Sequence, residues 1–114
     1  MDDCLFCKII NGQIPSDMVY ENDKIVVFKD IKPEAPIHVL IVPKLHIGSI
    51  QELNDGNSEY LVAIHYAANK VAEKLGIYDK GYRLINNCGR DAGQSVNHLH
   101  YHLLGGKFLG AKIL

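Results

Sequence analysis

Three histidines stand at alternate positions near the end of the 114-residue sequence, in the segment His98-Leu99-His100-Tyr101-His102. Side chains alternate between the two faces of a β-strand, so a strand here would place the three imidazoles on one face, with neighbours roughly 6.6 Å apart. Imidazole can act near neutral pH as a nucleophile, as an acid or base, or as a metal ligand. A solvated polar strand face is the plain alternative. The strict repeat and the two glycines that follow favour a reaction centre instead.

A loop that contains two glycines runs from Gly89 to Ser95, directly before the histidines. Glycine lets backbone amides approach a phosphate group closely, and Gln94 and Ser95 add side-chain hydrogen-bond donors. Such a loop indicates little by itself. Next to a potential nucleophile it favours a small phosphorylated ligand.

The chain contains three cysteines, of which Cys4 and Cys7 form a C-x-x-C pair and Cys88 stands alone. An odd number of cysteines without an export signal argues against a disulfide framework. The pair can bind a metal, be redox-active or be incidental. No βαβ pattern of the thioredoxin type surrounds it, which weakens the redox interpretation, and Cys88 is expected to be a partly buried structural thiol.

The elements that must position these residues are short strands and one long helix. Apolar residues at spacings of three and four predict a helix from about Ser58 to Leu75, with Asn57 or Ser58 capping its start and Gly76 ending it. A short helix is expected at Leu5 to Ile10. Strands are expected at Val19–Tyr20, Ile25–Phe28, His38–Pro43, Tyr82–Asn86 and Leu99–Leu104. This order predicts one α+β domain over residues 1–114, with an antiparallel sheet packed on the long helix.

Composition narrows the class of protein. Hydrophobic residues make up 47% of the chain, and 12 basic against 13 acidic residues give a formal net charge of −1. The balance argues against a broad basic surface for long nucleic acids. No stretch approaches the ~20 apolar residues of a membrane span, and the acidic start lacks the basic region of a secretory signal. We therefore expect a cytoplasmic protein that binds neither membranes nor long nucleic acids.

The segment from Ser95 to Leu104 resembles the signature of the histidine triad (HIT) family, His-x-His-x-His with apolar residues between and after the histidines. Other segments match the Hint branch of this family in order and approximate spacing: Phe6–Ile10, Phe28–Ile31, Ala35–His38, Val42–His46 and Gly93–Ser95. The resemblance extends from Cys4 to about Gly106. It implies a five-stranded antiparallel sheet with one long helix, and a homodimer in which two sheets join edge to edge.

The resemblance also implies roles for individual side chains. His100 matches the nucleophile, which attacks the α-phosphorus of a nucleoside 5′-phosphoramidate or related nucleotide conjugate and gives a nucleotidyl-histidine intermediate that water hydrolyses. Its other ring nitrogen would be held by a backbone carbonyl. His38 and His102 match residues that bind the phosphate oxygens, and Ser95 matches the residue beside the leaving group. Asp30, otherwise an ordinary turn residue, matches the residue that binds the ribose hydroxyls.

Further matched positions would surround a small nucleotide of the AMP or GMP type. Asn87, Gly93 and Gln94 match residues near the phosphate. An apolar slot for the base is matched by Leu5, Phe6, Ile9, Ile14, Phe28 and Leu40, which would otherwise simply be core residues. Such a slot accepts adenine and guanine alike. The tail Gly105–Leu114 contains no tryptophan. In the best-known Hint proteins an aromatic residue of the partner's tail helps form the leaving-group side of the site, so the preferred leaving group stays open.

Some bacterial members of the family bind a structural zinc ion through a cysteine pair, a histidine after a Val-Pro-Lys segment and the first histidine of the triad. The corresponding residues here are Cys4, Cys7, His46 and His98. Two cysteines and two histidines can close a tetrahedral zinc site without an open position for water. The resemblance therefore implies that His98 is a metal ligand and not a catalyst. A further histidine, His65, is expected to be an ordinary helix residue.

Two other functions stay open from the sequence. His98, His100 and His102 could instead bind a catalytic zinc ion, although successive residues on one strand face are spaced too widely to converge easily. The chain could also be a nucleotide-binding signalling module with incidental turnover, or a nucleotidyl transferase. The presence of both a nucleophile and a leaving-group residue favours an enzyme.

Overall fold

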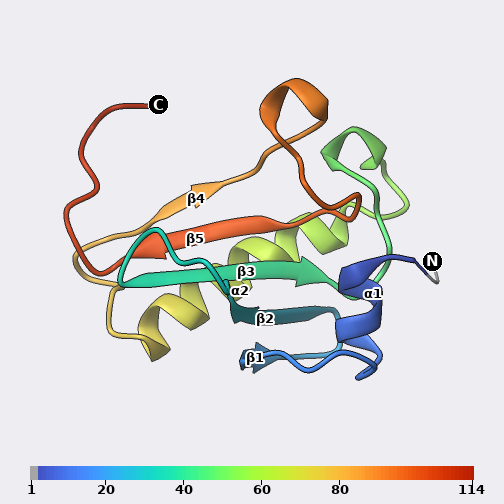
Figure 1. Cartoon of the computed structure of the whole chain (residues 1–114), viewed down its shortest axis with the longest axis horizontal. Coiled ribbons are helices and arrows are strands. Elements are labelled where there is room, and N and C mark those ends of the chain that lie inside the picture. Colours follow the sequence, from blue (N-terminus) through green and yellow to red (C-terminus); the bar gives the residue numbers. More distant parts are fainter. Residues whose placement is uncertain (1–2) are drawn as a thin grey trace.

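The structure is a computed structural model that describes residues 3–114 (Figure 1). Its strands are β1 (Met18–Glu21), β2 (Ile25–Lys29), β3 (Ile37–Pro43), β4 (Arg83–Ile85) and β5 (Tyr101–Gly105). Its α-helices are α1 (Leu5–Ile10) and α2 (Glu59–Lys74). All strand pairs are antiparallel in the order β1-β2-β3-β5-β4, which confirms the expected α+β fold and leaves β1 and β4 at the edges. Within the described residues, no helix is both long and apolar enough to cross a membrane.

Helix α2 covers one face of the sheet (Figure 1). Its buried side chains are Ile64, Ala67, Ala68, Val71 and Ala72. The three small alanines let the helix approach the sheet closely, and the helix ends where Gly76 adopts a φ of 77°, as a left-handed terminal glycine does. Ser58 is the residue before the helix, but its side chain makes no capping hydrogen bond. The predicted helix is therefore confirmed, but the predicted cap is not, because the Asn57 side chain also bonds elsewhere, to Asn54 and Glu52.

Helix α1 packs on the opposite face of the sheet and closes a second, smaller core. Phe6 and Ile9 of the helix contact Val26, Phe28, Leu40 and Val42 of β2 and β3. Apolar side chains therefore cover both faces of the two central strands, which explains why these strands are continuous apolar runs and not alternating ones.

Strand β5 begins at Tyr101, two residues later than expected, so His98 and His100 precede the strand. The main chain leaves the sheet here because the amide of Leu99 donates to the carbonyl of Ile47, at 2.6 Å. Leu99 and Leu103 still lie in the core beneath α2. The predicted alternation thus holds, and the histidines lie on the other face, beside α1.

Candidate active site

A cavity of about 650 Å³ opens on the face of the sheet that carries α1. Its walls include these residues expected at a nucleotide site: Leu5, Phe6, Ile9, Ile14, Phe28, Asp30, Leu40, Ser95, His100 and His102. Residues from α1, β2, β3 and the segment leading into β5 thus meet at one place. The cavity combines an apolar wall with a carboxylate, a hydroxyl and two imidazoles, as a small site for a nucleotide requires.

The main chain determines which nitrogen of His100 is free. His100 Nδ1 lies 2.8 Å from the carbonyl oxygen of His98. A carbonyl only accepts hydrogen bonds, so Nδ1 carries the proton and Nε2 keeps its lone pair. The ring is 4% exposed, and the Phe6 ring packs edge-on against it with 5.0 Å between centroids. This confirms the expected contact between the ring and a backbone carbonyl, which leaves Nε2 free of that contact.

His102 presents a hydrogen-bond donor instead of an acceptor, and a chain of hydrogen bonds that begins at the main chain determines this. The amide of Glu34 donates to His38 Nδ1 at 3.1 Å, so the proton of a neutral His38 is on Nε2. His38 Nε2 lies 2.9 Å from His102 Nδ1, which therefore accepts. The proton of a neutral His102 is then on Nε2, and His102 is a hydrogen-bond donor next to His100, with 5.4 Å between the two ring centroids.

Electrostatics keeps His102 neutral. Burial lowers its pKa, and the neighbouring His100 and His38 lower it further by repulsion between positive charges. Asp30 and Glu34 oppose this effect. The carboxylate of Asp30 contacts His38 Nε2 at 3.5 Å through Oδ2, while Oδ1 accepts from the amide of Lys32 at 2.8 Å. Asp30 is thus held on the cavity wall by the turn that follows β2.

Several predicted site residues do not line this cavity. His38 lies behind His102. Gln94 uses its side chain within the loop, since Oε1 accepts from the amide of Gly89 and Nε2 donates to the carbonyls of Gly48 and Val96. Asn87 donates to the carbonyl of Ala92, and Gly93, with a φ of 79°, ends a short turn. These residues shape the loop, and their contact with phosphate stays a prediction.

Other cavity residues carry no clear signal in the sequence: Pro15, Ser16, Asp17, Lys29, Ile31 and Val96. Most follow or precede a predicted residue in the chain, and only the fold shows that they face the same space. Ile31 is the residue that the sequence could have indicated, because it is an apolar residue in a loop beside Asp30. In the structure its side chain is 92% exposed. A large apolar group exposed at a cavity is available to contact a ligand.

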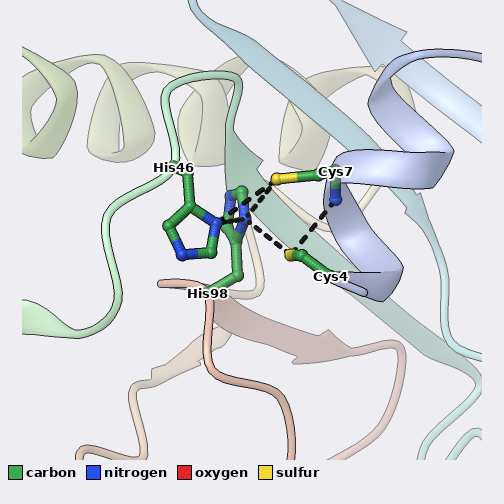
Figure 2. Close-up of side chains that lie close together, drawn as sticks. All are labelled: Cys4, Cys7, His46 and His98. Carbon is green, nitrogen blue, oxygen red and sulfur yellow. Dashed lines mark hydrogen bonds between the residues drawn. The ribbon is translucent and has the colours of Figure 1, made fainter. Parts of the chain in front are cut away.

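Cys4, Cys7, His46 and His98 form a separate cluster, in which their side chains point toward one another from α1 and two loops (Figure 2). Their donor atoms all lie within 4.8 Å of one another. The Sγ–Nδ1 distances are 3.3 Å for Cys4 with His98 and for Cys7 with His46, and the two Nδ1 atoms are 3.1 Å apart. A tetrahedral zinc site has ligand–ligand distances of roughly 3.3–3.8 Å. The residues present fit such a site.

The second nitrogen of His98 supports this fit. His98 Nε2 contacts the carbonyl oxygen of Pro43 at 2.9 Å, so the proton is on Nε2 and the Nδ1 lone pair faces the cluster. Burial lowers the pKa of His98 to about 4, which keeps its ring in the neutral form that binds metals. Burial and the neighbouring Cys4 raise the pKa of the Cys7 thiol to about 11, so a bound cation would have to displace its proton.

A catalytic metal held by His98, His100 and His102 has no support among residues 3–114, because the donor atoms of these histidines do not converge. The donors of Asp30, His38 and His102 do lie together. The contacts between Asp30 and His38 and between His38 and His102 account for that proximity. The histidine segment is therefore divided, with His98 in the cysteine cluster and the other two at the cavity.

Comparisons with known proteins show which family the chain belongs to. Residues 3–113 match the family model "Scavenger mRNA decapping enzyme C-term binding". The chain is 44% identical over 109 residues to the purine nucleoside phosphoramidase of Escherichia coli strain K12, across 96% of this chain and 92% of that protein. A HIT family hydrolase from Clostridium thermocellum is 58% identical with a TM-score of 0.98, across 100% of this chain and 99% of the other. A histidine triad nucleotide-binding protein from Candida albicans is 36% identical with a TM-score of 0.80, across 96% and 85%. The chain therefore belongs to the histidine triad family and is a hydrolase of the HIT type.

Proposed function

We propose that the protein hydrolyses nucleoside 5′-phosphoramidates or related nucleotide conjugates through a nucleotidyl intermediate on His100. The observation that carries this proposal is the hydrogen bond from His100 Nδ1 to the carbonyl of His98, which leaves Nε2 free at a cavity with one apolar wall. The name of the E. coli relative, a purine nucleoside phosphoramidase, supports the same substrate class.

The reaction would proceed in two displacements. The lone pair of His100 Nε2 forms a bond to the α-phosphorus while the bond from phosphorus to the leaving nitrogen breaks, and the leaving amine takes its proton from solvent with help from the Ser95 hydroxyl. Water then attacks the phosphorus while the bond from phosphorus to His100 Nε2 breaks, the proton of the water goes to solvent, and the nucleoside monophosphate and neutral His100 are released. His102 Nε2–H donates to a phosphate oxygen as negative charge develops there, and His38 holds His102 in that orientation.

The rest of the nucleotide would lie along the cavity. The apolar side chains of α1, β2 and β3 would sandwich the base, and the Asp30 carboxylate would accept hydrogen bonds from the ribose hydroxyls. Asn87, Gly93 and Gln94 would reach the phosphate only by giving up contacts within their loop. We therefore expect these three residues to matter less than His102 for phosphate binding.

The test is to trap the intermediate. Purified protein is mixed with an adenosine phosphoramidate, quenched within one turnover and analysed by mass spectrometry for a nucleotidyl group linked to nitrogen on His100. His100→Ala should show neither the adduct nor turnover, while His65→Ala, a change of an exposed helix histidine, should show both. Turnover by His100→Ala at the native rate would refute the proposal.

We also propose that Cys4, Cys7, His46 and His98 hold a structural zinc ion. When bound, the ion would link α1 to the loops that carry the two histidines, and it would take no part in the reaction because its four ligands leave no open position. Elemental analysis of protein purified without added metal should give one zinc per chain. Cys4→Ser should lower that ratio, and Cys88→Ser should not.

We further propose a homodimer and a cytoplasmic location. The dimer follows from the family resemblance and from an unpaired sheet edge at β4. The location is supported by the three free cysteines of the described residues, since two of them must stay reduced to bind a metal and the cytoplasm keeps thiols reduced.

A further inference from the structure

We infer that Asn86 is a positioning residue for the nucleophile His100, an inference that rests on the proposed function. Asn86 directly follows β4, and its Nδ2 atom donates to the main-chain carbonyl oxygen of His100 at 2.9 Å. The residue does not line the cavity and would not touch the substrate. Any effect on the reaction must therefore act through the position of His100.

The contact lies at the point where the sheet stops supporting the nucleophile. Residues of β4 and β5 pair as far as Ile85 with His102, and the ladder ends there. His100, two residues before that pair, has no neighbouring strand on the β4 side. The Asn86 amide takes the place of the main-chain donor that a longer β4 would have provided.

His100 is consequently held at two points. Its ring is held by the carbonyl of His98 through Nδ1, and its own carbonyl is held by Asn86. These two contacts together determine the peptide plane and the direction of the ring, and hence the direction of the Nε2 lone pair. Misplacement of a reacting atom by ~1 Å can reduce a rate about 100-fold.

The oxygen of the Asn86 side chain indicates that a contribution to folding stability alone does not explain why an asparagine stands at this position. Its Oδ1 atom is buried and has no hydrogen-bond partner among the described residues. A buried acceptor without a partner disfavours folding. The two preceding residues of β4, Leu84 and Ile85, are apolar, and an apolar side chain at position 86 would avoid this penalty. An unsatisfied polar group that is retained despite its cost points to a role in function.

The test compares Asn86→Val with Asn86→Asp in the intact protein. Valine removes the donor and the orphaned acceptor together, so the two effects on stability oppose each other. Aspartate keeps the shape but turns an acceptor toward the His100 carbonyl. We expect kcat for an adenosine phosphoramidate to fall roughly 10–100-fold in Asn86→Val and further in Asn86→Asp, with KM within about twofold of the native value. The melting temperature of Asn86→Val should stay within a few degrees of native.

A second readout is the Nδ1–H proton of His100 in NMR spectra of both variants, which should exchange with water faster than in the native protein. Asn69→Val, which removes a side-chain amide bonded to Tyr82 on the exposed surface of α2, should change neither readout. A native kcat in Asn86→Val would overturn the inference. A fall in kcat accompanied by a large drop in melting temperature and by weaker substrate binding would overturn it as well, because it would indicate general loss of structure. Absence of turnover in the native protein would instead refute the proposed function, so the two failures are distinguishable.

Discussion

His100 and His102 have the same side chain but offer opposite groups to the cavity, and main-chain contacts decide the difference. The carbonyl of His98 accepts a hydrogen bond from Nδ1–H of His100, which leaves Nε2 as the nitrogen that can accept. The amide of Glu34 donates to His38 Nδ1 and so selects the tautomer in which His38 Nε2 donates to His102, which leaves a donor at Nε2 of His102. A nucleophile must be an acceptor and a phosphate ligand must be a donor, so this arrangement matches the two proposed roles.

The lowered pKa of His102 leads to a prediction about pH. An unfolded histidine titrates near pH 6.5, so between that value and the lower folded pKa the unfolded chain binds more protons. The stability contributed by neutral His102 is therefore complete above about pH 6.5 and is lost as pH falls through the folded pKa. In thermal melts between roughly pH 4 and 8, the melting temperature of His102→Gln should fall less on acidification than that of the native protein. An equal drop in melting temperature in the two proteins would contradict the contribution of His102 to acid sensitivity. His65→Gln serves as the control.

Asp30 leads to a prediction about binding. If its carboxylate accepts bonds from the ribose, Asp30→Asn should raise KM roughly 10–100-fold, as expected for a hydrogen bond to a charged group, with a smaller change in kcat. Asp17→Asn is the matched control, because Asp17 lines the same cavity but its exposed carboxylate forms an ion pair with the exposed Lys29. Steady-state kinetics with ribose and 2′,3′-dideoxyribose substrates should show that Asp30→Asn no longer discriminates between them. Preserved discrimination would exclude a ribose contact.

At the scale of elements, α1 depends most on its surroundings. It spans only Leu5–Ile10, which is far shorter than a helix that is stable by itself in water. Its start is organised by Cys4, whose sulfur accepts from the amide of Cys7. The same helix provides three apolar side chains of the cavity wall. The cysteine cluster and the apolar wall of the cavity therefore both depend on this one short helix.

Metal removal should accordingly weaken nucleotide binding. Treatment with a strong chelator, or Cys7→Ser, should lower the melting temperature by roughly 5 °C or more and raise the Kd for AMP, because α1 loses its anchor. Cys88→Ser should change neither quantity, since Cys88 lies outside the cluster. Calorimetry and thermal melts on the same samples provide both measurements. Unchanged AMP affinity after complete metal loss would show that apolar packing alone holds α1.

The same elements show what the sequence predicts and what it does not. The bounds of α1 and the core of α2 follow from apolar spacing and from residues at helix ends, which are local properties. The start of β5 does not, because it is decided by the contact of Leu99 with Ile47, 52 residues away in the chain. The contact of Asn86 with His100 likewise exists only because β4 and β5 are neighbours. The cysteine cluster was predicted by family resemblance, not by spacing.

For the whole molecule, the sheet separates a packed side from a reactive side. Beneath α2 the core is continuous and contains buried apolar residues of α2 and of β1, β2, β3 and β5. On the other face α1 covers only part of the sheet (Figure 1). The cavity and the cysteine cluster lie on this face. The central strands β2 and β3 thus support both the core and the site. The sequence predicts the first role from apolar content. It indicates the second only through the family resemblance, which matches Phe28, Asp30, His38 and Leu40 to a nucleotide site.

The two edges of the sheet differ in a way that selects a dimer interface. Edge β1 carries an irregularity between Met18 and Tyr20, which disturbs its outer hydrogen-bonding groups. Edge β4 pairs regularly with β5 and has half-buried side chains throughout. A regular, unprotected edge readily pairs with a second copy of itself. We therefore expect the proposed homodimer to join at β4 and not at β1.

Matched lysine substitutions test this expectation. Ile85→Lys places a charge on β4, where an antiparallel copy would bring two such charges close together, so the dimer should dissociate at least tenfold more readily than the native protein. Met18→Lys places the same charge on β1 at a residue that is 41% exposed, and it should leave the dimer intact. Sedimentation over a range of protein concentrations measures both dissociation constants. A native protein that stays monomeric at every concentration would exclude the dimer. A dimer that Met18→Lys dissociates and Ile85→Lys does not would place the interface at β1, because the two variants add the same charge at different edges.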